Sequence, residues 1–163
     1  MKHSTYFWVF FLGFVVIDQL VKAWARGAMD VGGSVNGLPW PGVFELTLTY
    51  NKGIAFGMFQ GLGVLMAPIG VAIAWFAGRH SFRHSSASPL LHIALGLLAS
   101  GAIGNLIDRV FLGQVTDMFA FRFIDFPVFN VADSCITVSA IALVFLLGRE
   151  AAPVQESQES ASI

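Results

Sequence analysis

The sequence predicts a mainly α-helical membrane protein with four transmembrane helices and a small extracytoplasmic β-sheet. Hydrophobic residues make up 56% of the 163 residues and charged residues only 12%, whereas soluble domains carry about 25% charged residues. Four apolar stretches, over about 6–25, 61–78, 89–107 and 131–148, approach the roughly 20 residues that cross a bilayer. We therefore predict one polytopic domain over 1–150 and a polar, disordered cytoplasmic tail over 151–163.

The composition excludes several classes of protein. The formal net charge is −1, so the charge balance does not favour a nucleic acid as partner. Cys135 is the single cysteine, which excludes an internal disulfide and a multi-cysteine zinc site. No base stands beside Cys135 in the sequence, and we expect it to be a packing residue.

The first apolar stretch carries charges near its end. Asp18 and Lys22 stand four residues apart with the acid first, which places them on one helix face in the favourable order. A cleaved signal peptide is the alternative, because Lys2 precedes an apolar run and Ala23-Trp24-Ala25 resembles a cleavage site. A charged pair so close to that site favours the helix.

The third apolar stretch contains small residues at a regular spacing. Gly96, Ser100 and Gly104 follow one another at intervals of four residues. Small residues at this spacing allow helices to approach closely in lipid. We predict that they form a packing face.

Four spans place both termini on the same side of the membrane. The numbers of Lys and Arg residues on the two sides do not decide the orientation. The loop over 79–88, RHSFRHSSAS, is basic and free of acidic residues, whereas acidic and basic residues are mixed on the other side. We therefore place this loop and both termini in the cytoplasm.

The first outer loop contains a predicted strand. Apolar and polar residues alternate over 43–50, with β-branched and aromatic side chains among them. A turn over 51–53 and a second apolar run follow, which together suit a small sheet at the membrane surface, since a sheet edge within lipid is not tolerated. Gly53 and Gly57 would also allow the segment 52–59 to move as a lid.

The second outer loop, over 108–130, is rich in phenylalanine. Its aromatic residues are Phe111, Phe119, Phe121, Phe123, Phe126 and Phe129. They suit an interfacial aromatic belt, and they also suit a wall for a lipid or an apolar peptide. Composition alone favours the belt.

Two carboxylates near the predicted outer surface are candidate catalytic groups. Taken singly, Asp117 suits a solvated loop, and Asp133 suits the first turn of a helix, where its charge is favourable. Two carboxylates in one cleft, however, cannot easily both ionise and can share a proton. One would then act as a base on water while the other donates a proton, as aspartyl peptide hydrolysis requires.

Four blocks in this order resemble the bacterial lipoprotein signal peptidases, or signal peptidase II. The blocks are DQLVK at 18–22, NKGIAFG at 51–57, GAIGNLIDR at 101–109 running into GQVTD at 113–117, and FNVADS at 129–134. Each block is weak evidence of kinship by itself, but four in order on four apolar stretches are highly specific. The resemblance covers about 6–148 and leaves the tail outside.

The resemblance implies an intramembrane aspartyl endopeptidase that removes the signal peptide from prolipoproteins by cutting before a cysteine that carries diacylglyceryl. The catalytic aspartates of the family fall on Asp117 and Asp133. Its supporting and substrate-binding residues fall on Asp18, Lys22, Asn51, Gly53, Asn105, Asp108, Arg109, Asn130 and Ala132. No metal or organic cofactor is implied.

The resemblance also implies a location and partners. It places the chain in the bacterial cytoplasmic (inner) membrane with both termini in the cytoplasm and the active site near the extracytoplasmic face. The expected partners are lipid-modified prolipoproteins and membrane lipids, and we expect a monomer. Because the family retains its first helix, the resemblance disfavours a cleaved signal peptide.

Two other classes of function stay open at this point. A four-span proton-coupled transporter would use Asp18 as a proton relay, although long outer loops argue against it. A non-enzymatic lipoprotein-binding protein would bind the lipidated substrate without cutting it. Most of the weight for a peptidase comes from the four blocks.

Overall fold

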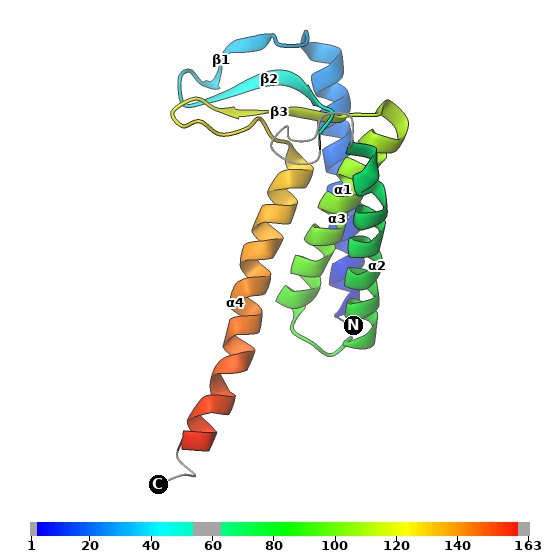
Figure 1. Ribbon diagram of the computed structural model, residues 1–163, viewed down its shortest axis with the longest axis vertical. Helices are drawn as coiled ribbons and strands as arrows, with labels where there is room; N and C mark the ends of the chain where they lie inside the picture. The colour runs from blue at the N-terminus through cyan, green and yellow to red at the C-terminus, as the bar shows by residue number, and fades with distance from the viewer. Residues whose placement is uncertain (1–2, 54–62, 160–163) are drawn as a thin grey trace.

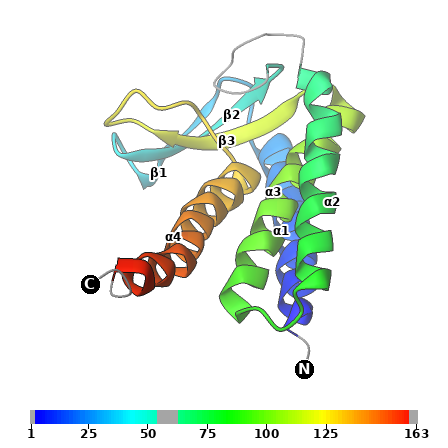
Figure 2. The same cartoon turned by 60° about the horizontal axis from the view of Figure 1, so that its bottom comes forward.

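The computed structural model describes residues 3–53 and 63–159. The elements within them are α1 (Ser4–Ala28), β1 (Ser34–Trp40), β2 (Phe44–Asn51), the short 3-10 helix η1 (Gly63–Met66), α2 (Ala67–Arg83), α3 (Pro89–Leu112), β3 (Val115–Phe121) and α4 (Val131–Glu159). Helices α1, α2 and α3 pack side by side, and the sheet lies across one end of them (Figures 1 and 2). The start of α1 and the end of α4 lie at the opposite end (Figure 1).

Each of the four predicted spans corresponds to a helix, with shifted bounds. Within the described residues, α1 and α3 are long and apolar enough to cross a membrane, whereas the apolar part of α4, Val131–Leu146, is shorter. Helix α2 has 17 residues, and its predicted first residues, 61–62, lie outside the described part of the chain. The described residues are mainly helical with a small antiparallel sheet, as the sequence predicts.

The predicted basic loop over 79–88 is mostly helical. Helix α2 continues to Arg83, because nothing in the sequence before it breaks a helix. The chain then turns, and Ser88 begins α3 by accepting a hydrogen bond from the backbone N–H of Leu91 at 3.3 Å. Pro89 follows at the first helical position, where its missing N–H has no cost.

Helix α4 also differs from its predicted bounds. It continues to Glu159, so 151–159 is helical where the sequence predicts a disordered tail. Pro153 lies within this helical segment and removes one backbone hydrogen bond. The alanines, glutamines and glutamates around it are good helix formers that extend a helix already nucleated before them. Residues 160–163 of the predicted tail lie outside the described residues.

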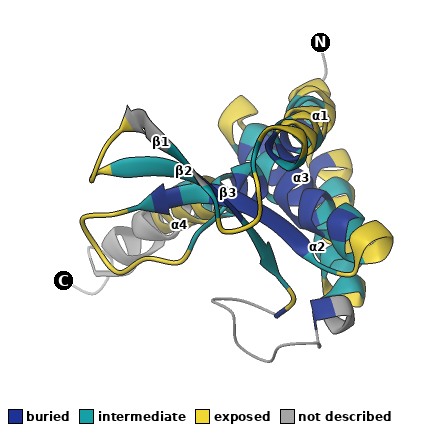
Figure 3. Cartoon of the chain, turned by 90° about the horizontal axis from the view of Figure 1, so that it is seen from above, coloured by how far each residue is buried: buried dark blue, intermediate teal, exposed yellow. Residues whose placement is uncertain are grey.

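Helix α3 is the centre of the bundle, and its small residues allow close packing. A Cβ atom added at Gly96 would lie 2.7 Å from the carbonyl oxygen of Phe7 in α1. A Cβ atom at Gly104 would lie 2.5 Å from a carboxylate oxygen of Asp18 and 3.2 Å from the Cβ of Ala132 in α4. The predicted packing face is confirmed, and buried residues run along much of α3 and β3 (Figure 3).

The sheet is antiparallel with strand order β1-β2-β3. The predicted strand over 43–50 is confirmed as β2, one residue further along. Its alternation is interrupted by a register shift between Leu46 and Thr49, so the adjacent Thr47 and Leu48 are both buried. Strands β1 and β3 are elements that the sequence analysis did not predict.

The chain between β3 and α4 folds back onto β3. The backbone N–H of Phe129 donates to the carbonyl of Phe119 at 3.0 Å, and the N–H of Phe119 donates to the carbonyl of Phe129 at 2.8 Å. Phe121 and Phe126 pack around this pair, and Phe123 contacts Phe121 at the exposed edge of the cluster. Phe111, at the end of α3, is exposed.

The predicted turn after β2 is present. The backbone N–H of Gly53 donates to the side-chain oxygen of Asn51 at 2.8 Å, which closes an Asx turn. The predicted apolar run over 54–59, and with it most of the lid segment 52–59, lies outside the described residues.

Candidate active site

Asp117 lies in the middle of β3, with its side chain almost completely buried. It is 3% exposed, and the side-chain N–H of Asn130 donates to one of its carboxylate oxygens at 2.6 Å. Burial, and then the nearby carboxylate of Asp133, raise the pKa of Asp117 from 3.8 to about 7, against the opposing effects of Asn130, Lys22 and Arg109. This carboxyl group can therefore gain or lose a proton near neutral pH.

Asp133 lies in the first turn of α4 and forms a reciprocal cap with Asn130. The backbone N–H of Asp133 donates to the side-chain oxygen of Asn130 at 2.9 Å. The backbone N–H of Asn130 in turn donates to the carboxylate of Asp133 at 3.2 Å. This capping box satisfies two backbone donors and fixes the Asp133 carboxylate in one orientation, so its structural role as a helix cap is compatible with a chemical one.

Asn130 joins the two carboxylates. Its amide nitrogen donates to Asp117, and its amide oxygen and backbone N–H engage Asp133. Asn130 is itself fully buried. The return of the chain along β3 produces this arrangement, because the pairing of Phe129 with Phe119 brings Asn130 beside Asp117.

A buried lysine supports the second oxygen of Asp133 through an asparagine. The side-chain N–H of Asn105 donates to Asp133 at 2.7 Å. The amide oxygen of Asn105 accepts from Lys22 at 3.0 Å and from Asn130 at 3.1 Å. Lys22 has no exposed surface, and a buried ammonium group is stable only when it is paired.

Asp18 and Asp108 supply the carboxylates that pair with Lys22. The ammonium nitrogen of Lys22 lies 2.9 Å from a carboxylate oxygen of Asp18 and 3.7 Å from one of Asp108. Both carboxylates are buried. The predicted i, i+4 pair of Asp18 and Lys22 is therefore present, but it faces the protein interior.

The same two carboxylates also hold the backbone beside the candidate catalytic residues. Asp18 accepts a hydrogen bond from the backbone N–H of Ala132 at 2.9 Å, one residue before Asp133. Asp108 accepts one from the backbone N–H of Thr116 at 2.8 Å, one residue before Asp117. Asp18 in α1 thus fixes the start of α4, which carries Asp133. Asp108 in α3 fixes β3, which carries Asp117.

A cavity of about 660 Å³ opens at these carboxylates. Its polar lining residues are Asn51, Asn105, Arg109, Asp117, Asp133, Ser134 and Thr137. Its remaining lining is mostly apolar and comes from α2, α3, α4 and the Phe126–Phe129 turn, including Ile69, Ile73, Leu106, Ile136 and Val138. The cavity can therefore hold an apolar group beside the two carboxylates.

Three predicted site residues lie at the edge of this arrangement. The side chain of Asn51 lines the cavity but uses its oxygen to close the turn with Gly53. Gly53 is buried within that turn. Arg109 lines the cavity and lowers the pKa of Asp117 by its positive charge.

Three supporting residues were missed from the sequence. Gln19 donates to Asp18 at 3.1 Å and to the carbonyl of Gly104 at 3.1 Å. Arg26 donates to the hydroxyl of the buried Thr116 at 2.9 Å. Arg26 continues the four-residue spacing of Asp18 and Lys22. This polar stripe on one helix face is the sequence feature from which Arg26 could have been predicted. Nothing in the local sequence marks Thr116.

The fold is that of bacterial membrane enzymes. A solved structure described as a bacterial membrane enzyme at 2.3 Å resolution is similar with a TM-score of 0.81 and 28% identity, covering 90% of each chain. A second, at 1.9 Å resolution, has a TM-score of 0.75 and 29% identity, covering 86% of this chain and 91% of the other.

The sequence relatives define the family. The family model described as Signal peptidase (SPase) II matches residues 10–148. A lipoprotein signal peptidase of Synechocystis sp. is 38% identical over 85% of each chain, and one of Symbiobacterium thermophilum is 40% identical over 81% of this chain and 86% of the relative. A third, of Gloeothece citriformis, is 35% identical over 99% of each chain. The chain belongs to the signal peptidase II family, and the resemblance found in the sequence is confirmed.

Proposed function

We propose that this protein is an aspartyl endopeptidase of the bacterial inner membrane that removes signal peptides from prolipoproteins. It would cut before the cysteine that carries diacylglyceryl. Membership of the signal peptidase II family supports the peptidase activity and the lipoprotein substrate. The observation that carries the catalytic assignment is the juxtaposition of the buried carboxylate of Asp117 and the partly buried carboxylate of Asp133 on one asparagine.

The proposed reaction uses one proton shared by the two carboxyl groups. The ionised carboxylate removes a proton from water, whose oxygen attacks the carbonyl carbon of the scissile peptide bond. The protonated carboxyl group gives its proton to the leaving nitrogen as the C–N bond breaks. A pKa of about 7 for Asp117 supports this scheme, since this carboxyl group can then carry the proton near neutral pH.

The supporting residues are proposed to keep this pair rigid. Asn130 and Asn105 orient the carboxylates. Lys22 supplies a positive charge behind them, through its hydrogen bond to Asn105. Asp18 and Asp108 anchor the adjacent backbone. Rigid donors cost no reorganisation when the reaction occurs, which is how fixed electrostatic groups accelerate it.

The cavity suits the proposed substrate. Its apolar lining along α2 and α4 would contact the apolar signal peptide and the acyl chains. Asn51 and Arg109 also line this cavity. In the proposed complex they bind the peptide backbone near the scissile bond, because amide and guanidinium groups donate to carbonyl oxygens.

The proposed topology has four spans with both termini in the cytoplasm. It is supported by the position of the start of α1 and the end of α4, which lie at the end of the molecule opposite the sheet (Figure 1). The sheet and the two aspartates would then face the extracytoplasmic side. We propose that the protein is a monomer. The mass of the purified protein in detergent tests this proposal.

The decisive experiment is cleavage of a diacylglyceryl-modified prolipoprotein by the purified protein in detergent. Wild type is compared with Asp117→Asn, Asp133→Asn and the matched control Asp125→Asn, whose carboxyl group is exposed on the neighbouring loop. Wild type and the control should cut before the lipidated cysteine, while the two site variants lose about 10²–10⁴-fold in rate.

Other outcomes of this experiment point to specific errors. Normal cleavage by a folded Asp117→Asn or Asp133→Asn protein would overturn the aspartyl assignment. Binding of the substrate without cleavage by wild type would favour a non-enzymatic binding protein. Loss of activity on adding a strong metal chelator would contradict the proposed chemistry.

A further inference from the structure

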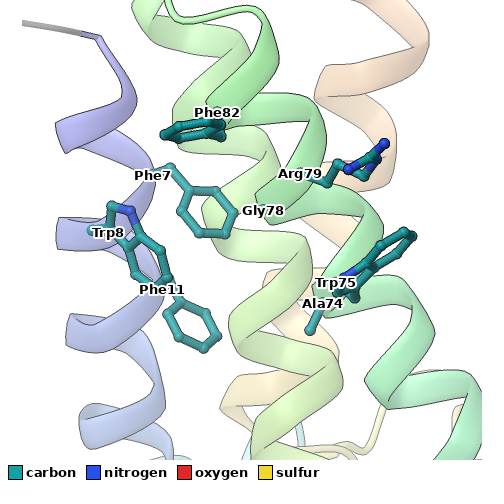
Figure 4. A pocket seen from close by; sticks show the side chains of 8 residues that line it. All are labelled: Phe7, Trp8, Phe11, Ala74, Trp75, Gly78, Arg79 and Phe82. Carbon is teal, nitrogen blue, oxygen red and sulfur yellow. The ribbon is translucent and has the colours of Figure 1, made fainter.

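A second hollow lies between α1 and α2, near the start of α1 and the end of α2. Its volume is about 390 Å³. Its aromatic walls are Phe7, Trp8 and Phe11 from α1 and Trp75 and Phe82 from α2, and Arg79 is the charged residue among its lining (Figure 4). Trp8 precedes Asp18 by ten positions on the same helix, which separates this aromatic groove from the candidate active site by about 15 Å.

The groove exists because one position of α2 has no side chain. A Cβ atom added at Gly78 would lie 3.5 Å from the ring of Phe7, so Gly78 and the edge of Phe7 form its floor. Trp8 and Trp75 are both 55% exposed, and Phe82, at the end nearest the chain turn, is 80% exposed. The groove is therefore mostly apolar and open to the surroundings, so a hydrocarbon chain can contact its aromatic walls.

The charged residues at and near the groove, Arg79 and Arg83, are both positive. The guanidinium carbon of Arg79 lies 5.3 Å from the ring centre of Trp75, a cation–π contact that holds the charge at the groove. The sequence contains no Asp or Glu in α2, nor in α1 before Asp18. The two helices that build the groove therefore bring no carboxylate to Arg79, and Arg83 adds a further positive charge one turn on.

We propose that this groove binds an anionic phospholipid, with an acyl chain against the aromatic walls and the phosphate paired with Arg79. A guanidinium group recognises phosphate through two parallel hydrogen bonds. Basic pockets between helices on the cytoplasmic side of a membrane bind acidic headgroups for this reason. The inference depends on the proposed membrane topology, which places this end of the bundle at the cytoplasmic leaflet, but not on the chemistry at Asp117 and Asp133.

Tryptophan fluorescence tests the site directly. Trp24 and Trp40 are replaced by phenylalanine, so that the emission comes from Trp8 and Trp75, the two remaining tryptophans. The protein is placed in nanodiscs that contain phosphatidylglycerol or phosphatidylcholine with the same brominated acyl chains, which quench a tryptophan on contact. Phosphatidylglycerol should reach half-quenching at about a fivefold lower mole fraction, as one basic residue near an anionic surface provides.

Matched variants separate the groove from general surface charge. Arg79→Gln should abolish the preference for phosphatidylglycerol, while Arg83→Gln, which removes the same charge outside the groove lining, should retain it. Gly78→Leu, which fills the floor, should weaken quenching by both lipids. Equal quenching of wild type by the two lipids, or an equal loss in the two arginine variants, would overturn the proposal.

Cleavage by the same variants distinguishes this inference from the proposed function. Arg79→Gln and Arg83→Gln should cut prolipoprotein in neutral detergent at the wild-type rate, because the groove is remote from the carboxylates. A protein that selects phosphatidylglycerol but does not cut refutes the peptidase alone. A protein that cuts but does not select refutes the lipid site alone.

Discussion

Replacement of Asp117 by asparagine is expected to stabilise the folded protein at neutral pH while it abolishes cleavage. Asparagine has the same shape, and its oxygen can still accept the hydrogen bond from Asn130 that Asp117 accepts at 2.6 Å. The substitution removes the cost of holding a buried carboxylate in its charged form. The gain in stability should therefore depend on pH.

The magnitude follows from the pKa of Asp117. Burial and Asp133 raise this pKa from 3.8 to about 7 in the folded state, which corresponds to up to about 4 kcal/mol. Below about pH 4 the group is protonated in the folded and unfolded states, and its ionisation does not affect stability. Between about pH 4 and pH 7 the unfolded state releases the proton first, so the stability of the wild type falls as pH rises. Above about pH 7 the group is ionised in both states, and the loss of wild-type stability no longer changes with pH.

The assay is thermal unfolding of the purified protein in detergent at several pH values. The difference between Asp117→Asn and wild type should be small at pH 4, increase up to about pH 7 and then level off. Asp125→Asn, an exposed control, should show no such trend. A folded Asp117→Asn protein whose stability relative to wild type is the same at every pH would refute the reasoning.

Three further changes test the packing and the hydrogen bonds. Asn130→Ser keeps a capping hydroxyl but loses the buried amide donor to Asp117 and to the carbonyl of Thr116. Thermal unfolding should show a destabilisation of about 1–3 kcal/mol. In the pH–rate profile, the apparent pKa that belongs to Asp117 should rise by about one unit. Gly104→Ala places a methyl group 2.5 Å from a carboxylate oxygen and should destabilise by about 1–3 kcal/mol in denaturant or thermal unfolding, whereas Gly27→Ala, with nothing within 4 Å, should be neutral or stabilising. Cys135→Ser should retain most of the cleavage activity, since Cys135 is a buried packing residue, and a folded but inactive variant would contradict this.

The positions of the helices could be predicted because the membrane imposes a length. An apolar run of about 20 residues suffices to cross a bilayer, and the predicted stretches over 6–25, 89–107 and 131–148 all fall within helices. The ends of the helices were less predictable. Helix α2 extends through a basic segment to Arg83, because charged residues at the end of a membrane helix do not disrupt its backbone.

Strand β3 shows where a pattern fails. Its sequence, VTDMFAF, places apolar residues on both faces, because one face packs on the helices and the other faces the aromatic cluster. Apolar and polar residues do not alternate in a strand that is covered on both faces. For this reason the sequence of β3 suits an interfacial aromatic belt as well as a strand. Strand β2 is predicted because apolar and polar residues alternate over 43–50.

The sequence by itself determined the membrane class, the helical segments, the small-residue packing face and, through four blocks in order, the family. Only the tertiary structure decided which polar groups meet. Asp18 and Lys22 come from α1, Asn105 and Asp108 from α3, Asp117 from β3 and Asp133 from α4, and no local pattern encodes a contact between segments so far apart. Burial in an apolar surrounding forces each of these groups to find a partner, and for this reason residues scattered along the chain form one hydrogen-bonded network.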